Sequence, residues 1–156
     1  MIIRKARGTD ASDLKVLYFE YLTHCPPEQE QDMTLWQNLI NKFEEDKHMY
    51  LLVVEEEGKV VSSVQMAIIE SLTHNVRPFA IIENVVTHKD YRKKGYAGEC
   101  LEYARQIAEK ENCYKMMLLT GSKKQETLRF YEKAGYNSSD KIPVQILQDT
   151  VCQVSA

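Results

Sequence analysis

The sequence predicts a mixed α/β fold, with helices on both faces of one central sheet. Two apolar runs joined by a tight turn, residues 49–54 and 60–69, predict a β-hairpin and therefore antiparallel strands. A strand–helix–strand unit follows between residues 79 and 120, and its two strands should run parallel with a right-handed crossover. The 156 residues fit one domain, 1–156, with a full core. We therefore expect a mixed, mostly antiparallel central sheet of about six to seven strands, flanked by about four helices.

The N-terminal segment predicts a strand and then a helix. Residues 1–6 alternate weakly and contain β-branched isoleucines, which favours a strand. Thr9 or Asp10 should cap the helix, and the Cys-Pro-Pro run at residues 25–27 should end it, because proline cannot continue a helix. The apolar side chains that recur at helical spacing are Leu14, Leu17, Tyr18, Tyr21 and Leu22.

A second helix should begin at a capping box formed by Thr34 and Gln37. Its apolar face is expected to hold Leu35, Trp36, Leu39, Ile40 and Phe43. The loop before it, residues 23–32, is rich in proline and acidic residues and has no apolar pattern of its own. This loop would either border a substrate pocket or serve as a solvated connector.

The rest of the chain alternates strands with helices. The hairpin turn at residues 56–59 contains a glycine that can adopt positive φ, and a polar connector follows at 71–78. From there the expected elements are a strand at 79–87, a helix at 98–111, a strand at 114–120, a helix at 126–134, and strands starting at Tyr136 and at 143–147. Glu83 is the residue that does not suit a buried strand. Asn112 and Gly135 stand where they can end the two helices.

The composition is that of an ordinary globular protein, with 44% apolar and 28% charged residues. The formal net charge of −3 argues against a general nucleic-acid binder, which would be basic overall. No apolar run reaches the ~20 residues of a membrane span, and the N-terminus lacks the pattern of a signal peptide. The 4 cysteines and 4 histidines are scattered, so we expect free thiols, a cytoplasmic location and no metal site.

A short basic stretch, residues 92–97, stands out against this acidic background. It lies between a predicted strand and a predicted helix and reads R-x-x-G-x-A. The first N–H groups of a helix have no partner within it, and the helix dipole adds partial positive charge there. Basic side chains beside those groups suit the stretch to a phosphate. It matches neither the P-loop nor the dinucleotide fingerprint.

Two motifs carry a resemblance to a known family. Residues 92–97 resemble the pyrophosphate-binding loop of the GCN5-related N-acetyltransferases (the GNAT superfamily), usually written (Q/R)-x-x-G-x-(G/A). Residues 128–136, Leu-Arg-Phe-Tyr-Glu-Lys-Ala-Gly-Tyr, closely resemble the late motif F-Y-E-K-x-G-(F/Y). The expected order of elements also resembles the GNAT fold over nearly the whole chain. Lys93 and Ala97 replace glycines that are frequent in the family.

The resemblance implies acetyl-CoA as the donor and a primary amine as the acceptor. The strand at 79–87 would bulge and separate from the strand at 114–120, leaving a slot for pantetheine. Backbone groups of Val85, Val86 and Thr87 would then pair with the pantetheine amides and polarise the thioester carbonyl. The pyrophosphate would bind the loop formed by Arg92, Lys93, Lys94, Gly95, Tyr96 and Ala97.

Glu83 and Tyr131 are the catalytic candidates. An ammonium acceptor must lose a proton before it attacks, and Glu83 could accept that proton directly or through water. Partial burial in an apolar strand would make this carboxylate a stronger base. Tyr131 matches the family's tyrosine, whose phenol can give a proton to the departing thiolate. The alternatives are a strand-edge glutamate that faces solvent or pairs with a lysine, and a tyrosine that belongs to the core.

Three further residues complete the expected cofactor site. Phe130 would pack beside Tyr131, and Thr127 lies where some relatives place an asparagine that contacts coenzyme A. Lys133, with Arg129, would contact the adenosine 3′-phosphate, although exposed helix charges are the usual default.

The sequence therefore predicts an acyltransferase that moves the acetyl group of acetyl-CoA to a primary amine of a small molecule or peptide by direct attack. One alternative is a catalytically inactive module that binds acetyl-CoA for regulation, and another is a nucleotide- or RNA-phosphate binder. Residues 82–86 also resemble the glucosamine-6-phosphate N-acetyltransferases, which carry Ile-Glu-Asp where this chain has Ile-Glu-Asn. Asn84 thus leaves the acceptor open. The family likeness is compatible with a homodimer and implies no partner among nucleic acids or membranes.

Overall fold

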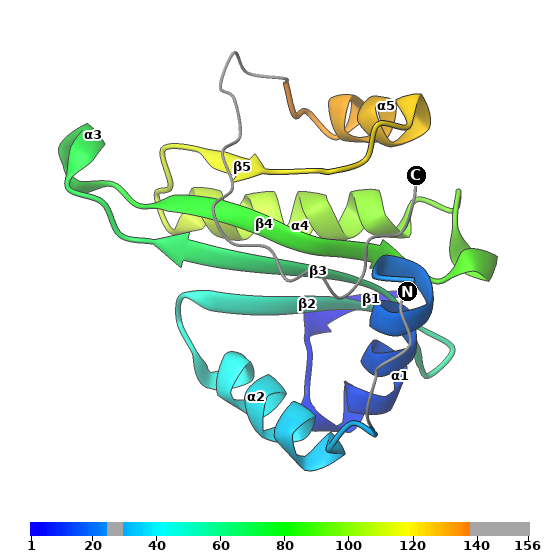
Figure 1. The fold of residues 1–156 in the computed structure, drawn as a ribbon. Coiled ribbons are helices and arrows are strands. Elements are labelled where there is room, and N and C mark those ends of the chain that lie inside the picture. Colours follow the sequence, from blue (N-terminus) through cyan, green and yellow to red (C-terminus); the bar gives the residue numbers. More distant parts are fainter. Residues whose placement is uncertain (25–29, 138–156) are drawn as a thin grey trace.

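A computed structural model describes residues 1–24 and 30–137 of the chain. Its centre is a five-stranded sheet with the strand order β1-β2-β3-β4-β5, and helices lie on both faces of it (Figure 1). The predicted mixed α/β fold is confirmed. The strand expected at 143–147 lies outside the described residues, and Tyr136 is not in a strand, so the sheet as described has fewer strands than expected.

The strands pair as the sequence predicts. They are β1 (Ile2–Lys5), β2 (Met49–Glu56), β3 (Lys59–Ile69), β4 (Phe79–Thr87) and β5 (Met116–Leu118). Neighbours from β1 to β4 are antiparallel, whereas β4 and β5 are parallel. Glu57 and Gly58 both have positive φ in the β2–β3 turn, as a tight hairpin turn requires.

The N-terminal helices agree with the prediction at the first cap, where Asp10 precedes the first α-helical segment, and differ from it at the second. The first forms as η1 (Gly8–Asp10), α1 (Ala11–Val16) and a wider π-helical turn, η2 (Leu17–Leu22). The second is α2 (Met33–Glu45), whose N-cap is Asp32, because the Asp32 carboxylate accepts a hydrogen bond from the Thr34 amide at 2.8 Å. The predicted Thr34–Gln37 capping box is therefore wrong. So is the expected burial of Leu35 and Leu39, which are 66% and 50% exposed.

The helices of the C-terminal half lie close to their predicted places. They are α3 (Thr73–Val76), a short turn inside the predicted connector, η3 (Lys89–Tyr91), α4 (Tyr96–Lys110) and α5 (Gln125–Lys133). Asn112 and Gly135 have positive φ just after α4 and α5, as residues that end helices often do. Helix α4 starts two residues earlier than the predicted Gly98, which places its first turn inside the basic stretch.

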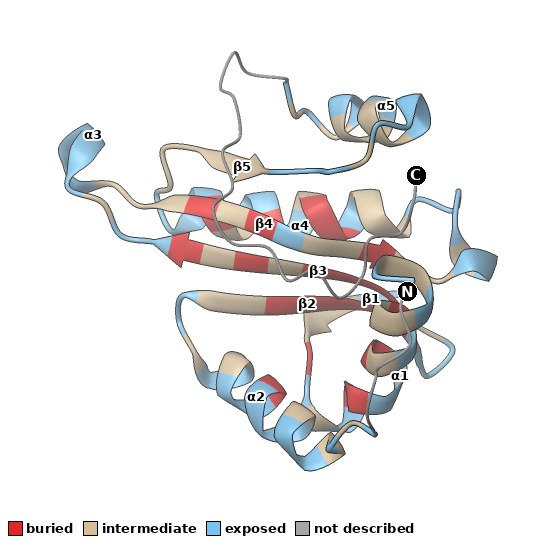
Figure 2. Ribbon diagram, in the orientation of Figure 1, coloured by how far each residue is buried: buried red, intermediate tan, exposed pale blue. Residues whose placement is uncertain are grey.

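Two apolar cores, one on each face, hold the sheet between its helices. On one face α4 packs Cys100, Leu101, Ala104 and Ala108 against the strands. On the other, α1, η2 and α2 contribute Ala11, Leu14, Leu17 and Ile40. In Figure 2 the buried residues concentrate along the central strands and on the inward sides of these helices. Side chains of β2 and β3 alternate between the two cores, which fixes their register.

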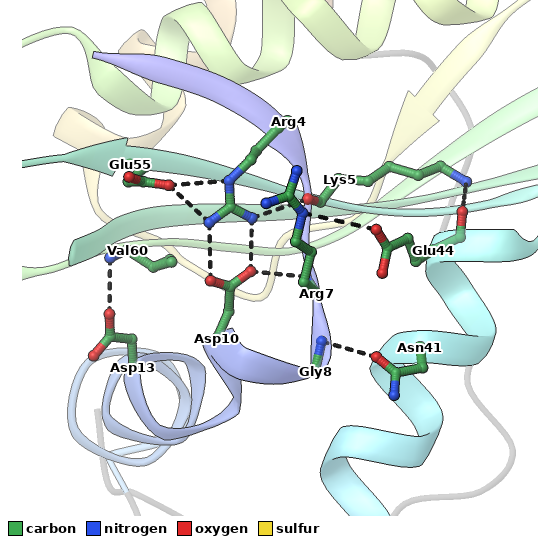
Figure 3. Close-up of polar contacts among 10 residues, drawn as sticks. All are labelled: Arg4, Lys5, Arg7, Gly8, Asp10, Asp13, Asn41, Glu44, Glu55 and Val60. Carbon is green, nitrogen blue, oxygen red and sulfur yellow. Dashed lines mark hydrogen bonds and ion pairs between the residues drawn. The ribbon is translucent and has the colours of Figure 1, made fainter. Parts of the chain in front are cut away.

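A polar cluster fastens the N-terminal helices to the edge of the sheet (Figure 3). Arg4 on β1 makes a two-pronged contact with Asp10, at 2.7 and 2.9 Å, and also bonds to Glu55 on β2. Burial alone would raise the pKa of Asp10, but hydrogen bonds from Arg4 and from the Arg7 amide outweigh it and lower that pKa. Asp13 on α1 accepts a hydrogen bond from the Val60 amide on β3. These contacts set where η2 leaves α1.

Candidate active site

Strand β4 carries a bulge at its centre. Glu83 pairs with Gln65 and Val86 pairs with Ser63, so two β4 residues face a single β3 residue between these pairs. Asn84 sits in the bulge with a φ of 53°, a conformation that asparagine tolerates better than most residues. Its side-chain amide donates a hydrogen bond to the Gln65 side chain at 2.9 Å. The bulge predicted for this strand is therefore present.

Strands β4 and β5 separate next to the bulge. Their pairing ends at Ile82 and Leu118, while β4 continues to Thr87. A cavity of about 970 Å³ opens where they separate. Val85, Val86 and Thr87 all line it, so the segment predicted to meet pantetheine borders an open slot. The carbonyls of Val86 and Thr87 accept hydrogen bonds from the side chains of Ser62 and Arg92, which fixes this stretch of backbone.

The basic stretch closes one end of the cavity. Gly95 is the N-cap of α4, with a φ of 89°, and Lys93 also has positive φ. The two left-handed residues turn the chain sharply before a 15-residue helix, so the orphan N–H groups of its first turn lie beside the cavity. Arg92, Lys93, Gly95, Tyr96 and Ala97 line the cavity. Lys94 does not line it; its ammonium lies over the Tyr91 ring.

Glu83 lies in the cavity wall but is exposed. Glu83 is still paired with Gln65 on β3, next to the bulge, and its side chain is not enclosed by apolar neighbours. Partial burial of Glu83 was therefore a wrong expectation. Its place on the wall, near the point where β4 and β5 separate, keeps it available to a molecule bound in the cavity.

Tyr131 on α5 lines the same cavity as Glu83. Burial raises the pKa of its phenol, and the negative charge of Glu83 raises it further. The phenol therefore holds its proton at neutral pH. Its ring packs against Phe130, with centroids 5.1 Å apart, and against Tyr136. The two catalytic candidates, which are far apart in sequence, thus come together at one site.

The remaining predicted residues divide into two groups. Thr127 and Phe130 line the cavity. Lys133 does not line it and is exposed at the end of α5, so its predicted contact with the cofactor finds no support in the cavity's shape. Lys93 Nζ and Glu126 Oε1 are 3.6 Å apart and form an ion pair, in which both side chains are largely exposed.

Part of the cavity wall comes from the N-terminal half of the chain. The sequence left open whether the loop at 23–32 borders a pocket, and His24 in that loop lines the cavity. Tyr21, Leu22 and His24 reach the cavity from η2 and the residue stretch that follows it. The apolar spacing of Tyr21 and Leu22 correctly indicates a helix, but nothing in that spacing shows that this helix borders the gap between β4 and β5. The stretch 118–122 after β5 also lines the cavity.

The described part of the chain holds neither a candidate metal site nor a candidate membrane span. In residues 1–24 and 30–137, no three His, Cys, Asp or Glu side chains are grouped to hold a metal ion. Within the same ranges no helix has both the length and the apolar character needed to cross a membrane.

Comparison with known proteins places the chain in a family. A model of the Acetyltransferase (GNAT) family matches residues 13–136, so the chain belongs to that family. Enzymes of this family use acetyl-CoA. The family assignment predicted from the two motifs is confirmed.

Individual relatives agree with this assignment. A glucosamine 6-phosphate N-acetyltransferase of Trypanosoma brucei brucei is 30% identical over 84 residues, which are 54% of this chain and 55% of that protein. The chain thus spans about half the length of this curated relative. A solved structure from Agrobacterium tumefaciens strain C58, provisionally named an acetyltransferase, is 32% identical with a TM-score of 0.84, covering 95% of this chain and 100% of that one.

A more distant structure shares the fold alone. The glucosamine-6-phosphate N-acetyltransferase of Arabidopsis thaliana superposes with a TM-score of 0.80 at 22% identity, covering 95% of this chain and 98% of that one.

Proposed function

We propose that this protein transfers the acetyl group of acetyl-CoA to a primary amine of a small molecule or peptide by direct attack. The observation that carries the proposal is the cavity between β4 and β5, which has the N-terminus of α4 at one end and both Glu83 and Tyr131 on its walls. Its volume of about 970 Å³ is large enough for a cofactor-sized ligand.

The cofactor would lie along β4. Its pyrophosphate would meet the amides of residues 93–97 and the Arg92 guanidinium, a combination of helix dipole and full charge that favours an anion. The pantetheine arm would follow Val85, Val86 and Thr87. A backbone N–H in this segment would stabilise the oxyanion that forms when the thioester carbonyl is attacked.

Glu83 and Tyr131 would each take part in the proton transfers that the reaction needs. The acceptor ammonium loses a proton to Glu83, directly or through a water, and the free amine then forms a C–N bond to the thioester carbon. The C–S bond breaks as the tetrahedral intermediate collapses, and the departing thiolate takes the phenol proton of Tyr131. Because burial and Glu83 raise the pKa of Tyr131, the phenol keeps its proton until the thiolate forms. The nitrogen of the new amide still carries one excess proton, which it loses to the Tyr131 phenolate through water, and Glu83 returns its own proton to solvent.

The inactive regulatory module is the alternative. It would need the cofactor cavity but no groups for proton transfer. Glu83 and Tyr131 both face the cavity, and this arrangement favours the catalytic function.

The acceptor is best sought among small amines that include amino-sugar phosphates. The Trypanosoma relative is named for glucosamine 6-phosphate, but this chain carries Asn84 in the bulge, with its amide turned to Gln65. We also propose, from the family likeness and the scattered cysteines, a cytoplasmic enzyme that is compatible with a homodimer.

An amine-library screen tests the proposal. The purified protein would be incubated with acetyl-CoA and each amine, with glucosamine 6-phosphate among them, and free thiol would be measured. We expect amine-dependent thiol release and a higher melting temperature with acetyl-CoA than with ATP, because a ligand that binds the native state stabilises it. Stabilisation by acetyl-CoA without thiol release for any amine would favour the regulatory module. No stabilisation by acetyl-CoA would contradict both.

A further inference from the structure

We infer that Tyr21 and His88 are positioning residues that hold Arg92 toward the cofactor phosphates. This inference rests on the proposed function, because it concerns the same cavity, and it names two residues that the loop motif does not contain. Tyr21 lies on η2, far in sequence from the basic stretch that Arg92 begins, and both residues line the cavity. A helix of the N-terminal half would thus shape the anion-binding end of the site.

Arg92 is held from two sides, and both contacts leave its terminal nitrogens free. Its Nε donates a hydrogen bond to the Thr87 carbonyl at 3.2 Å. Its guanidinium carbon lies 5.9 Å from the centre of the Tyr21 ring, within the range of a cation–π contact. Among the described residues no carboxylate lies within ion-pair distance of Arg92. The two Nη groups can therefore form a two-pronged contact with a phosphate.

His88 in turn fixes the Tyr21 ring. The Tyr21 hydroxyl and His88 Nε2 are 3.2 Å apart, and the two rings meet edge to face with centroids 4.6 Å apart. His88 Nδ1 accepts a hydrogen bond from the Asp90 amide at 3.3 Å. This assigns the proton of a neutral His88 to Nε2, which then donates to the Tyr21 oxygen.

His88 is itself well anchored. Its backbone N–H donates to the Val61 carbonyl on β3 at 2.9 Å, and its carbonyl accepts from the Tyr91 amide. Its ring also meets the edge of the Tyr91 ring, with centroids 5.6 Å apart. A residue fixed to the sheet thus orients a tyrosine of η2, and that tyrosine lies against the arginine.

The geometry of η2 brings Tyr21 within reach. The Thr23 amide bonds to the Tyr18 carbonyl five residues back, at 2.9 Å, so this turn is wider than an α-helical turn. Such turns are frequent at functional sites. Tyr18 and Leu17 pack into the core beneath η2, while Tyr21 faces the cavity. Partial desolvation raises the pKa of the Tyr21 hydroxyl, and the nearby Glu20 and Asp90 carboxylates raise it further. The hydroxyl therefore stays neutral.

A double-mutant cycle on acetyl-CoA affinity tests the inference. The variants are Tyr21→Leu, Arg92→Ala and the pair, with dissociation constants from isothermal titration and melting temperatures to check the fold. We expect Tyr21→Leu to weaken binding about five- to tenfold in the native background, as loss of a partly desolvated cation–π contact does. In the Arg92→Ala background it should have almost no further effect. Tyr103→Leu, on the exposed side of α4, is the matched control and should leave affinity unchanged.

Two further variants separate the contribution of the Tyr21 ring to acetyl-CoA affinity from that of its hydroxyl. Tyr21→Phe keeps the ring over Arg92 and should weaken binding only about two- to threefold. His88→Leu should weaken binding at least as much, because it removes the same hydrogen bond and also the ring contact with Tyr21. Equal losses for Tyr21→Leu with and without Arg92 would overturn the inference, since Tyr21 would then act independently. Unchanged affinity in Tyr21→Leu would also overturn it. Failure of the native protein to bind acetyl-CoA would instead contradict the proposed function.

Discussion

The two ends of the cavity are built in different ways. The anion end is one continuous stretch, residues 92–97, and most of what it offers a phosphate is backbone N–H groups at the start of α4. The acyl-transfer end brings together Glu83 of β4 and Tyr131 of α5, which are distant in sequence. A side-chain substitution usually leaves backbone N–H groups in place, whereas it removes the functional group of Glu83 or Tyr131. We therefore expect mutations at the two ends to affect binding and turnover separately.

Tyr131→Phe should give the largest effect and test this separation most directly. The variant keeps the ring that packs against Phe130 and Tyr136 but has no proton to give the thiolate. We expect kcat to fall about 100-fold or more, with acetyl-CoA affinity within about twofold of the native protein.

Tyr103→Phe is the matched control, because it removes a hydroxyl from an exposed tyrosine of α4. Steady-state kinetics and titration of acetyl-CoA would measure both variants. Native-like turnover in Tyr131→Phe would remove the acid role.

Asp10→Asn should destabilise the fold without changing a residue at either end of the cavity. Asp10 is bonded to Arg4 and to the Arg7 amide, so we expect a loss of about 2 kcal/mol in the free energy of unfolding at pH 7. Acetyl-CoA affinity should change little at a temperature where the variant is folded.

The stability difference between the native protein and Asp10→Asn should shrink as the pH falls. The pKa of Asp10 is lower in the folded protein than in the unfolded chain. Its contribution is therefore complete above the unfolded pKa of about 4 and is lost as the pH falls through the folded pKa. Urea denaturation at pH 7 and near pH 3 should show the native protein and Asp10→Asn converging in stability at the acidic end. A difference that persisted at low pH would contradict the ionic origin.

Glu83→Gln should have a smaller effect on turnover, because Glu83 is exposed and water can share its role. We expect kcat/KM to fall about tenfold at mildly acidic pH, where an amine is almost wholly protonated, and less at alkaline pH. Glu70→Gln, an exposed carboxylate beyond the end of β3, is the control. A flat ratio of native to Glu83→Gln rates across pH would mean that water alone deprotonates the amine.

Gly95→Ala tests the anion end, and we expect it to have the smallest effect of these variants. No atom lies within 4 Å of a Cβ added at Gly95, but its φ is +89°, so the cost is backbone strain of about 1 kcal/mol in the free energy of unfolding. Gly98→Ala also adds a Cβ in open space, without positive φ, and should be neutral or slightly stabilising. Equal stabilities for the two variants, measured by urea denaturation, would show that the left-handed turn stores no strain.

The anion end could be predicted from sequence because its residues are contiguous. A glycine followed by an apolar helical stripe indicates a left-handed cap and a helix N-terminus without any knowledge of distant residues. The bulge and separation of β4 followed from the family likeness, and the pairing of Ser63 and Gln65 with β4 confirms the bulge.

The acyl-transfer end could be predicted only in part. Tyr131 belongs to a local motif, but its approach to Glu83 depends on contacts across the chain. The sequence left open whether Glu83 is partly buried or faces solvent, because the pattern of the strand alone does not decide between them. Leu35 and Leu39 were misplaced because helical spacing marks an apolar stripe without showing how much of it the sheet can cover.

The brief pairing of β5 has a consequence for motion. Helix α5, which carries Tyr131, has no fully buried residue, and it follows a strand joined to its neighbour through only three residue pairs. Such a segment should open locally far more often than β2 or β3. Its amides should exchange hydrogen for deuterium sooner than those of the central strands. A ligand bound between β4 and β5 would slow that exchange. Tyr131 would then be held in one position mainly while acetyl-CoA occupies the cavity.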